Sequence, residues 1–101
     1  MNELEQTHQI AQDQAELCKI FSHPSRILIL WALIRRDLSV GDIAKFVGSS
    51  VQNTSHHLRI MKGIGILHAH RDGQSIRYGI ADRGRCQTLL NKAPASMDAP
   101  E

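Results

Sequence analysis

Four side chains able to hydrogen-bond nucleic acid recur within the segment 50–62: Gln52, Asn53, His56 and Arg59. A helical period of 3.6 residues places them on one face and an apolar set on the other: Val51, Thr54, Leu58 and Met61. Amides, an imidazole and a guanidinium are the groups that bind base edges and phosphates, whereas an ordinary surface helix carries mostly Glu and Lys. The segment therefore predicts a helix that reads DNA. The alternative is that its polar side chains are merely solvated.

Position along this helix predicts separate roles for its side chains. Gln52 and Asn53 lie in the first turn, where an amide can pair with adenine. His56, one turn later, could meet a base edge or a phosphate, and we expect Arg59 to contact phosphate. His57 is either part of this surface or a structural histidine that holds the helix against the preceding one.

The segments before and after this helix are those needed to present it to DNA. Ser39 can cap a short helix that Gly48 ends, and Ser50 can cap the next one, so residues 39–62 predict a helix-turn-helix. In that arrangement the second helix enters the major groove.

Two alternating segments follow, 66–71 and 75–80, and the Asp-Gly pair between them is a strong hairpin signal. A hairpin in this place is a wing. Its cations, Arg71 and Arg77, could hold a minor groove or the DNA backbone. The alternative is a basic strand edge that discourages aggregation.

The rest of the chain predicts three supporting helices. Residues 3–21 carry a loose apolar stripe. The second helix has Pro24 in its first turn, runs through Ile34 or Arg35 and is apolar nearly all round, and Asp82 can cap a short last helix that runs through about Asn91. The expected fold class is mainly α with a small β-hairpin, a winged helix-turn-helix in the order α-α-α-α-β-β-α. This domain covers residues 1–92, and the polar tail 93–101 is expected to be disordered.

Charge is distributed unevenly along the 101 residues. Residues 1–17 contain four acidic and no basic residues, whereas residues 18–92 contain all twelve Lys and Arg against four acidic residues, a net charge of +8. Such a region attracts a polyanion, although a solvated basic surface is the plainer reading. The longest apolar run has eight residues and the N-terminus lacks a cationic signal region, so we expect a cytoplasmic protein with no membrane partner.

Several motifs resemble the arsenical-resistance-repressor (ArsR/SmtB) family of winged-helix regulators: HPSRILIL (23–30), LSVGDIA (38–44), SHHL (55–58), GIL (65–67), and RDGQ (71–74) with Tyr78. The match spans about residues 14–82. The resemblance implies a homodimeric transcriptional repressor that binds a palindromic operator and releases it when an inducer binds. It also adds Ser55 to the DNA-binding residues.

Two metal-site patterns of that family are missing from the sequence. Its arsenic and cadmium sensors carry thiols at the start of the third helix, where residues 36–42 have none. Its zinc, nickel and cobalt sensors carry His on a long last helix, where residues 82–90 have none. His68 and His70 alternate on one strand face, but no Asp/His/Cys cluster at ligand spacing accompanies them in the sequence. We therefore expect no metal and no cofactor; a metal-responsive repressor with a different site is an alternative.

The resemblance further implies that the first and last helices form a homodimer interface. Their apolar residues are Leu4, Ile10, Leu17, Phe21, Leu89 and Leu90. The alternative is that these helices only close the core of one chain.

Both cysteines of the chain, Cys18 and Cys86, fall on the same two helices. One hypothesis is a thiol sensor whose oxidation changes the spacing of the two recognition helices. Arg83 and Arg85 are expected to lower the pKa of the Cys86 thiol and favour the reactive thiolate. The alternative is a small apolar residue at Cys18 and an incidental surface thiol at Cys86.

The sequence thus predicts a DNA-binding repressor whose partners are duplex operator DNA, a second copy of the chain and an unknown inducer. The competing interpretation is a winged-helix module that binds another protein, which would not need the polar, basic surface. An enzyme is not expected, because the chain has no phosphate-binding glycine loop and no nucleophile–base pair.

Overall fold

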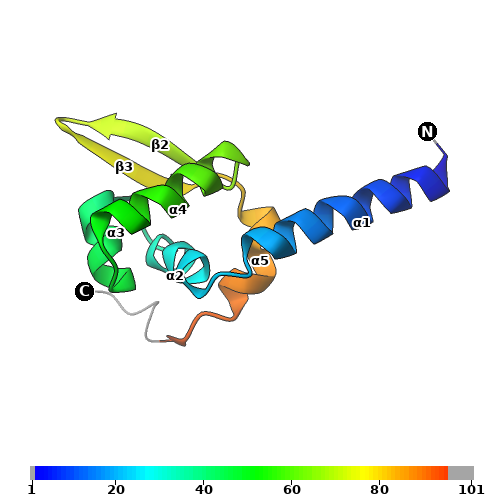
Figure 1. Cartoon of the computed structure of the whole chain (residues 1–101), viewed down its shortest axis with the longest axis horizontal. Helices are drawn as coiled ribbons and strands as arrows, with labels where there is room; N and C mark the ends of the chain where they lie inside the picture. Colours follow the sequence, from blue (N-terminus) through cyan, green and yellow to red (C-terminus); the bar gives the residue numbers. More distant parts are fainter. Residues whose placement is uncertain (1, 96–101) are drawn as a thin grey trace.

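The computed structural model describes residues 2–95 (Figure 1). Its helices are α1 (Glu3–Ile20), α2 (Pro24–Ala32), α3 (Val40–Val47), α4 (Val51–Gly63) and α5 (Arg83–Asn91), and its strands are β1 (Leu38–Ser39), β2 (Leu67–Asp72) and β3 (Ser75–Ile80). The predicted winged helix-turn-helix is confirmed. One element was not predicted: β1 pairs antiparallel with β3, so the wing belongs to a three-stranded sheet of order β1-β3-β2. Most of the expected tail, residues 96–101, lies outside the described part.

Local signals in the sequence account for the helix-turn-helix. The Ser39 hydroxyl accepts a hydrogen bond from the Asp42 backbone N–H at 3.3 Å, which caps α3. Gly48 ends α3 in the left-handed region at φ +76°, where glycine carries no Cβ penalty. The Ser50 hydroxyl then accepts from the Asn53 N–H at 3.0 Å and starts α4.

The core lies where α2, α3, α4 and the sheet meet. Its buried apolar side chains are Phe21, Ile29, Leu30, Leu33, Ile43, Leu58, Met61, Ile66, Leu67 and Cys86. The central helix α2 begins with Pro24 and ends at Ala32, two or three residues earlier than the sequence predicts. Residues 33–37 then connect α2 to β1 at the edge of the sheet.

The last helix, α5, is attached to the end of α2 by two hydrogen bonds. The Trp31 indole N–H donates to the Leu89 carbonyl at 2.9 Å. The Arg83 guanidinium donates to the Ile34 carbonyl at 2.8 Å and so satisfies a backbone group beyond the end of α2.

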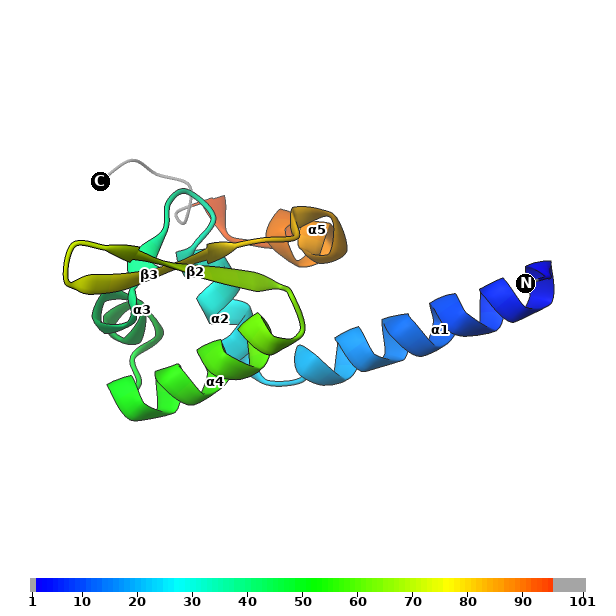
Figure 2. The same cartoon turned by 90° about the horizontal axis from the view of Figure 1, so that it is seen from above.

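The first helix, α1, stands away from the rest of the chain, with its N-terminus far from the body (Figures 1 and 2). None of its residues is buried. Only its C-terminal end reaches the core, through the partly buried Leu17 and Ile20. None of the described helices is both long and apolar enough to cross a membrane.

Candidate nucleic-acid interface

The inner face of α4 fixes this helix on the body of the protein. Thr54, His57, Leu58 and Met61 are all buried there. Val51, predicted for the same face, is 51% exposed at the first residue of the helix. Because three successive turns are anchored, the direction in which the outer face points is set by the core.

His57 is a structural histidine, and its partner comes from α2 rather than from the preceding helix α3. The buried Arg26 donates from Nε to His57 Nδ1 at 3.0 Å and from a terminal nitrogen to the Ile20 carbonyl at 3.2 Å. Desolvation lowers the pKa of His57, and the charges of Arg26, His23 and His56 lower it further. The neutral ring therefore accepts the guanidinium hydrogen bond and ties α4 to α2.

The outer face of α4 carries the predicted reading residues. Gln52, Asn53, His56 and Arg59 are exposed and, with Ser50, line an open hollow on the surface. The Asn53 amide nitrogen donates to the Ser49 hydroxyl at 2.9 Å, which holds this side chain over the first turn of α4. The remaining predicted contact, Ser55, is half-buried beside them.

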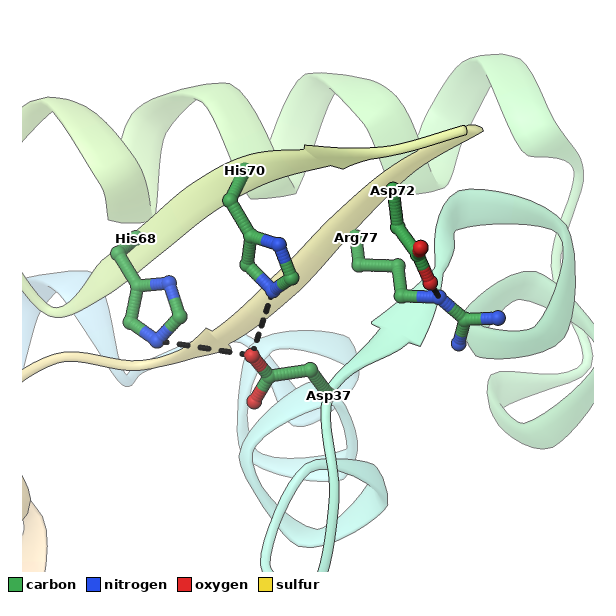
Figure 3. Close-up of polar contacts among 5 residues, drawn as sticks. All are labelled: Asp37, His68, His70, Asp72 and Arg77. Atoms are coloured by element: carbon green, nitrogen blue, oxygen red, sulfur yellow. Dashed lines mark hydrogen bonds and ion pairs between the residues drawn. The ribbon is translucent and has the colours of Figure 1, made fainter. Parts of the chain in front are cut away.

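The two wing arginines differ in their surroundings. Arg77 on β3 pairs with the Asp72 carboxylate at 2.7 Å, and Figure 3 shows its side chain turned toward Asp72. Arg71 on β2 is exposed. The two-residue turn Gly73–Gln74 joins the strands, and Gly73 adopts φ +67°. The positive charge that the wing can offer to a phosphate therefore comes mainly from Arg71.

The six predicted dimer-interface residues fall into three groups. Leu4 and Ile10 on α1 are 64% and 60% exposed. The partly buried ones pack against the core: Leu17, Leu89 and Leu90. Phe21 is only 8% exposed and belongs to the core of its own chain, so it leaves little surface for a partner.

Cys18 is exposed and Cys86 is buried, and the expected lowering of the Cys86 pKa is wrong. Burial raises the pKa of the Cys86 thiol, the charge of Asp82 raises it further, and the opposing effect of Arg85 is smaller. Cys86 is therefore neither an activated thiolate nor a surface thiol. Cys18 is exposed and lines a groove between α1 and α5 together with Leu17 and Leu89.

Sequence reasoning also missed a cluster of metal-ligating groups on the sheet (Figure 3). His70 Nε2 lies 2.9 Å from Asp37 Oδ2, and His68 Nε2 lies 3.8 Å from the same oxygen. One ligand atom from each residue lies within 4.8 Å of the others. Spacing along the sequence does not reveal this cluster, because Asp37 comes beside the two histidines only through the pairing of β1 with β3 and of β3 with β2. The alternation of His68 and His70 was the one signal visible in the sequence.

Known proteins share this architecture. A model of the bacterial regulatory protein, arsR family, matches residues 23–69. The HTH-type transcriptional regulator YgaV of Escherichia coli is 40% identical over 81 residues, which cover 79% of this chain and 82% of that protein. The cadmium resistance transcriptional regulatory protein CadC of Listeria innocua is 43% identical over 63 residues, 61% of this chain. The matched part is 53% of that protein, so the chain spans about half the length of this relative.

A solved structure extends the likeness to almost the whole molecule. The crystal structure of a predicted DNA-binding transcriptional regulator from E. coli is 34% identical, with a TM-score of 0.79 over 88% of this chain and 95% of that one. These relatives are transcriptional regulators, which confirms the expectation that the chain is no enzyme. The chain therefore belongs to the arsR family of bacterial regulatory proteins.

Proposed function

We propose that the chain is a cytoplasmic, homodimeric transcriptional repressor that binds a palindromic operator through α4 and the wing. The observation that carries the proposal is the division of α4 into an anchored inner face and an outer face of exposed hydrogen-bonding side chains. An anchored helix can place several donors against base edges at once, which is what readout in the major groove requires.

In this proposal Gln52 and Asn53 read bases from the first turn, and His56 and Arg59 follow along the groove. Asn53 must give up its bond to Ser49, or share it, to reach a base. Ser55, half-buried at the edge of this face, is at most a backbone contact. On the wing, Arg71 is the phosphate contact, and Arg77 stiffens the hairpin through Asp72.

The homodimer is supported by α1, because two of its large apolar side chains are left exposed by their own chain. Leu4 and Ile10 of α1 are 64% and 60% exposed. Figure 1 shows the N-terminal part of this helix standing away from the body. A second copy that covers them would also join two copies of α4, as a palindromic operator demands.

The proposal is tested by fluorescence anisotropy with duplex DNA from the chain's own upstream region and with random duplex DNA. We expect preference for the upstream DNA at moderate salt, and a steep fall in affinity as salt is raised, roughly 0.9 log unit per log unit for each phosphate contacted. Equal affinity for both duplexes would contradict the proposal of a repressor and favour a protein-interaction module.

Two substitutions assign the reading helix within that assay. Gln52→Ala should cost about 1–3 kcal/mol for operator DNA and little for random DNA, since the lost contact is to a base. Arg59→Ala should weaken both duplexes and lower the salt slope, since the lost contact is to phosphate. Gln12→Ala on the far part of α1 and Lys92→Ala after α5 are the matched controls. If both α4 variants bind like the parent, the assignment of α4 is wrong.

Thiol control of this repressor is a narrower proposal, and the geometry favours Cys18 as the reacting group. Cys18 is exposed in the groove between α1 and α5, the surface that a dimer would use, whereas Cys86 is buried with a raised pKa. A mild oxidant should then weaken operator binding by the parent and by Cys86→Ser but not by Cys18→Ser. If the oxidant weakens operator binding by Cys18→Ser as much as by the parent, oxidation of Cys18 does not control the repressor.

A further inference from the structure

The outer face of the sheet brings three metal-ligating residues together from two strands that are not neighbours. His68 and His70 alternate on β2 with the buried Leu67, so both rings point away from the core. Asp37 directly precedes β1, at the opposite edge of the sheet. Figure 3 shows the Asp37 carboxylate and the two imidazoles converging on one point above the sheet.

The strand register shows how side chains from opposite edges can meet. Leu38 pairs with Tyr78 and His68 pairs with Gly79, so Asp37, Gly79 and His68 lie in one row across the sheet. The outer two are separated by two strand spacings, roughly 9.6 Å, and an ordinary side chain on the middle strand would stand between them. Here the middle residue is a glycine.

Gly79 is the residue that makes room for this cluster. A Cβ atom built there would overlap the Asp37 carboxylate and lie 2.7 Å from His68 Nε2. Its backbone does not adopt positive φ, so turn geometry does not explain the glycine. Glycine inside a strand weakens it and often marks a place where another group approaches closely. In this sheet, the approaching groups are the two ligand-bearing side chains.

We propose that Asp37, His68 and His70 form a binding site for a divalent transition-metal ion of the zinc class. Two imidazole nitrogens and one carboxylate oxygen are a preferred ligand set for zinc, with water completing a tetrahedron. In such a tetrahedron, ligand atoms lie about 3.4 Å apart, given metal–ligand distances of about 2.1 Å. The separations of 2.9 and 3.8 Å from Asp37 Oδ2 bracket that value, so small side-chain rotations suffice.

The neighbouring charges are compatible with a cation at this place. Arg77 lies opposite His70 in the register, but its guanidinium is turned to Asp72 and its charge is compensated there. The Asp37 carboxylate is the anion of the cluster itself. An ion held by these ligands would connect β2 to the residue before β1 across β3, and so would stiffen the base of the wing.

The test is a titration of the full-length chain, stripped of metal with EDTA, with ZnCl₂ by calorimetry and with CoCl₂ by visible absorption. We expect one ion per chain, cobalt absorption bands typical of tetrahedral coordination, and no response to MgCl₂, which prefers all-oxygen sites. Asp37→Asn, His68→Gln and His70→Gln should each lower zinc affinity at least about tenfold, since even indirect ligand partners matter that much. His8→Gln on α1 and Cys18→Ser are controls that should bind zinc like the parent.

A second readout separates a bridging ion from loose surface binding. Zinc should slow amide exchange in residues 67–80 of the parent, and this protection should be absent in His70→Gln and in Gly79→Ala. Unchanged zinc affinity in both Asp37→Asn and His70→Gln, or no binding of zinc by the parent, would overturn the site and leave an ion-pair cluster only. Neither experiment contains DNA, so the result is independent of the proposed function.

Discussion

The helices α4 and α1 both carry apolar side chains and an exposed face, but the chain orients only one of them. α4 buries four side chains in the body, whereas α1 buries none. Both helices have a side-chain N-cap, Ser50 for α4 and Asn2 for α1. Capping therefore accounts for where each helix starts, and tertiary contacts account for which helix is held in place.

The exposed face of each helix indicates what kind of partner could bind it. The exposed side chains on the outer face of α4 are polar, which suits DNA, while the exposed Leu4 and Ile10 on α1 are apolar and suit another protein surface. If this comparison is right, substitutions on α1 should change association, and substitutions on the inner face of α4 should change the stability of the single chain. The following predictions test that separation.

The largest effect is expected on α1. Ile10→Glu should raise the dimer dissociation constant more than a hundredfold, because a symmetric dimer loses two buried isoleucines at about 1.5–3 kcal/mol each. Sedimentation equilibrium measures the constant. The control is Gln12→Glu, which adds the same charge about 160° around the helix at 100° per residue. If Ile10→Glu and Gln12→Glu associate equally well, α1 is not the dimer helix and the comparison fails.

A smaller effect, linked to pH, is expected from the Arg26–His57 contact that anchors α4. The pKa of His57 is lowered in the folded chain from 6.5, so the unfolded chain takes up a proton first as pH falls. Stability from this group is thus fully present above pH 6.5 and is lost below it, at up to about 1.4 kcal/mol per pH unit, until the folded pKa is reached.

Urea unfolding between pH 7 and pH 5 measures this loss. His57→Asn keeps an acceptor near Nδ1 but does not titrate, so its stability should fall less with acid than that of the parent. The control is His8→Asn, at an exposed position on α1 away from this contact, which should retain the parent's dependence. Equal pH dependence in the parent and His57→Asn would contradict the role of His57 as the neutral anchor.

The comparison also shows what sequence can and cannot supply. Ser39, Gly48 and Ser50 act on residues within four positions, so the helix-turn-helix was predictable from local chemistry. The Arg26–His57 bond joins residues 31 positions apart and depends on how α2 and α4 pack. The hydrophobic periodicity of a single segment cannot show which residues of α2 and α4 come into contact.

The metal-ligating cluster could not be predicted from the sequence either, because it depends on the pairing of strands that are far apart in the chain. Asp37 meets His68 and His70 only after β1 has paired with β3 and β3 with β2. β1 has two residues, too few to give an alternating pattern. Likewise, the burial of Cys86 depends on α5 lying against α2, and it outweighs the nearby Arg85 that suggested a lowered pKa.

The smallest predicted effect lies at the buried Thr54, inside the anchored face of α4. Thr54 is 1% exposed, and its hydroxyl oxygen has no hydrogen-bond partner among the described residues. Thr54→Val keeps the shape and removes the unsatisfied group, so it should stabilise the chain by about 1 kcal/mol. On α1, the exposed Thr7 hydroxyl donates to the Glu3 carbonyl at 2.9 Å, and Thr7→Val should change stability by less than about 0.5 kcal/mol. Urea unfolding of both variants measures the two effects. If Thr54→Val is less stable than the parent, the Thr54 hydroxyl has a hydrogen-bond partner, such as a buried water, that helps to anchor α4.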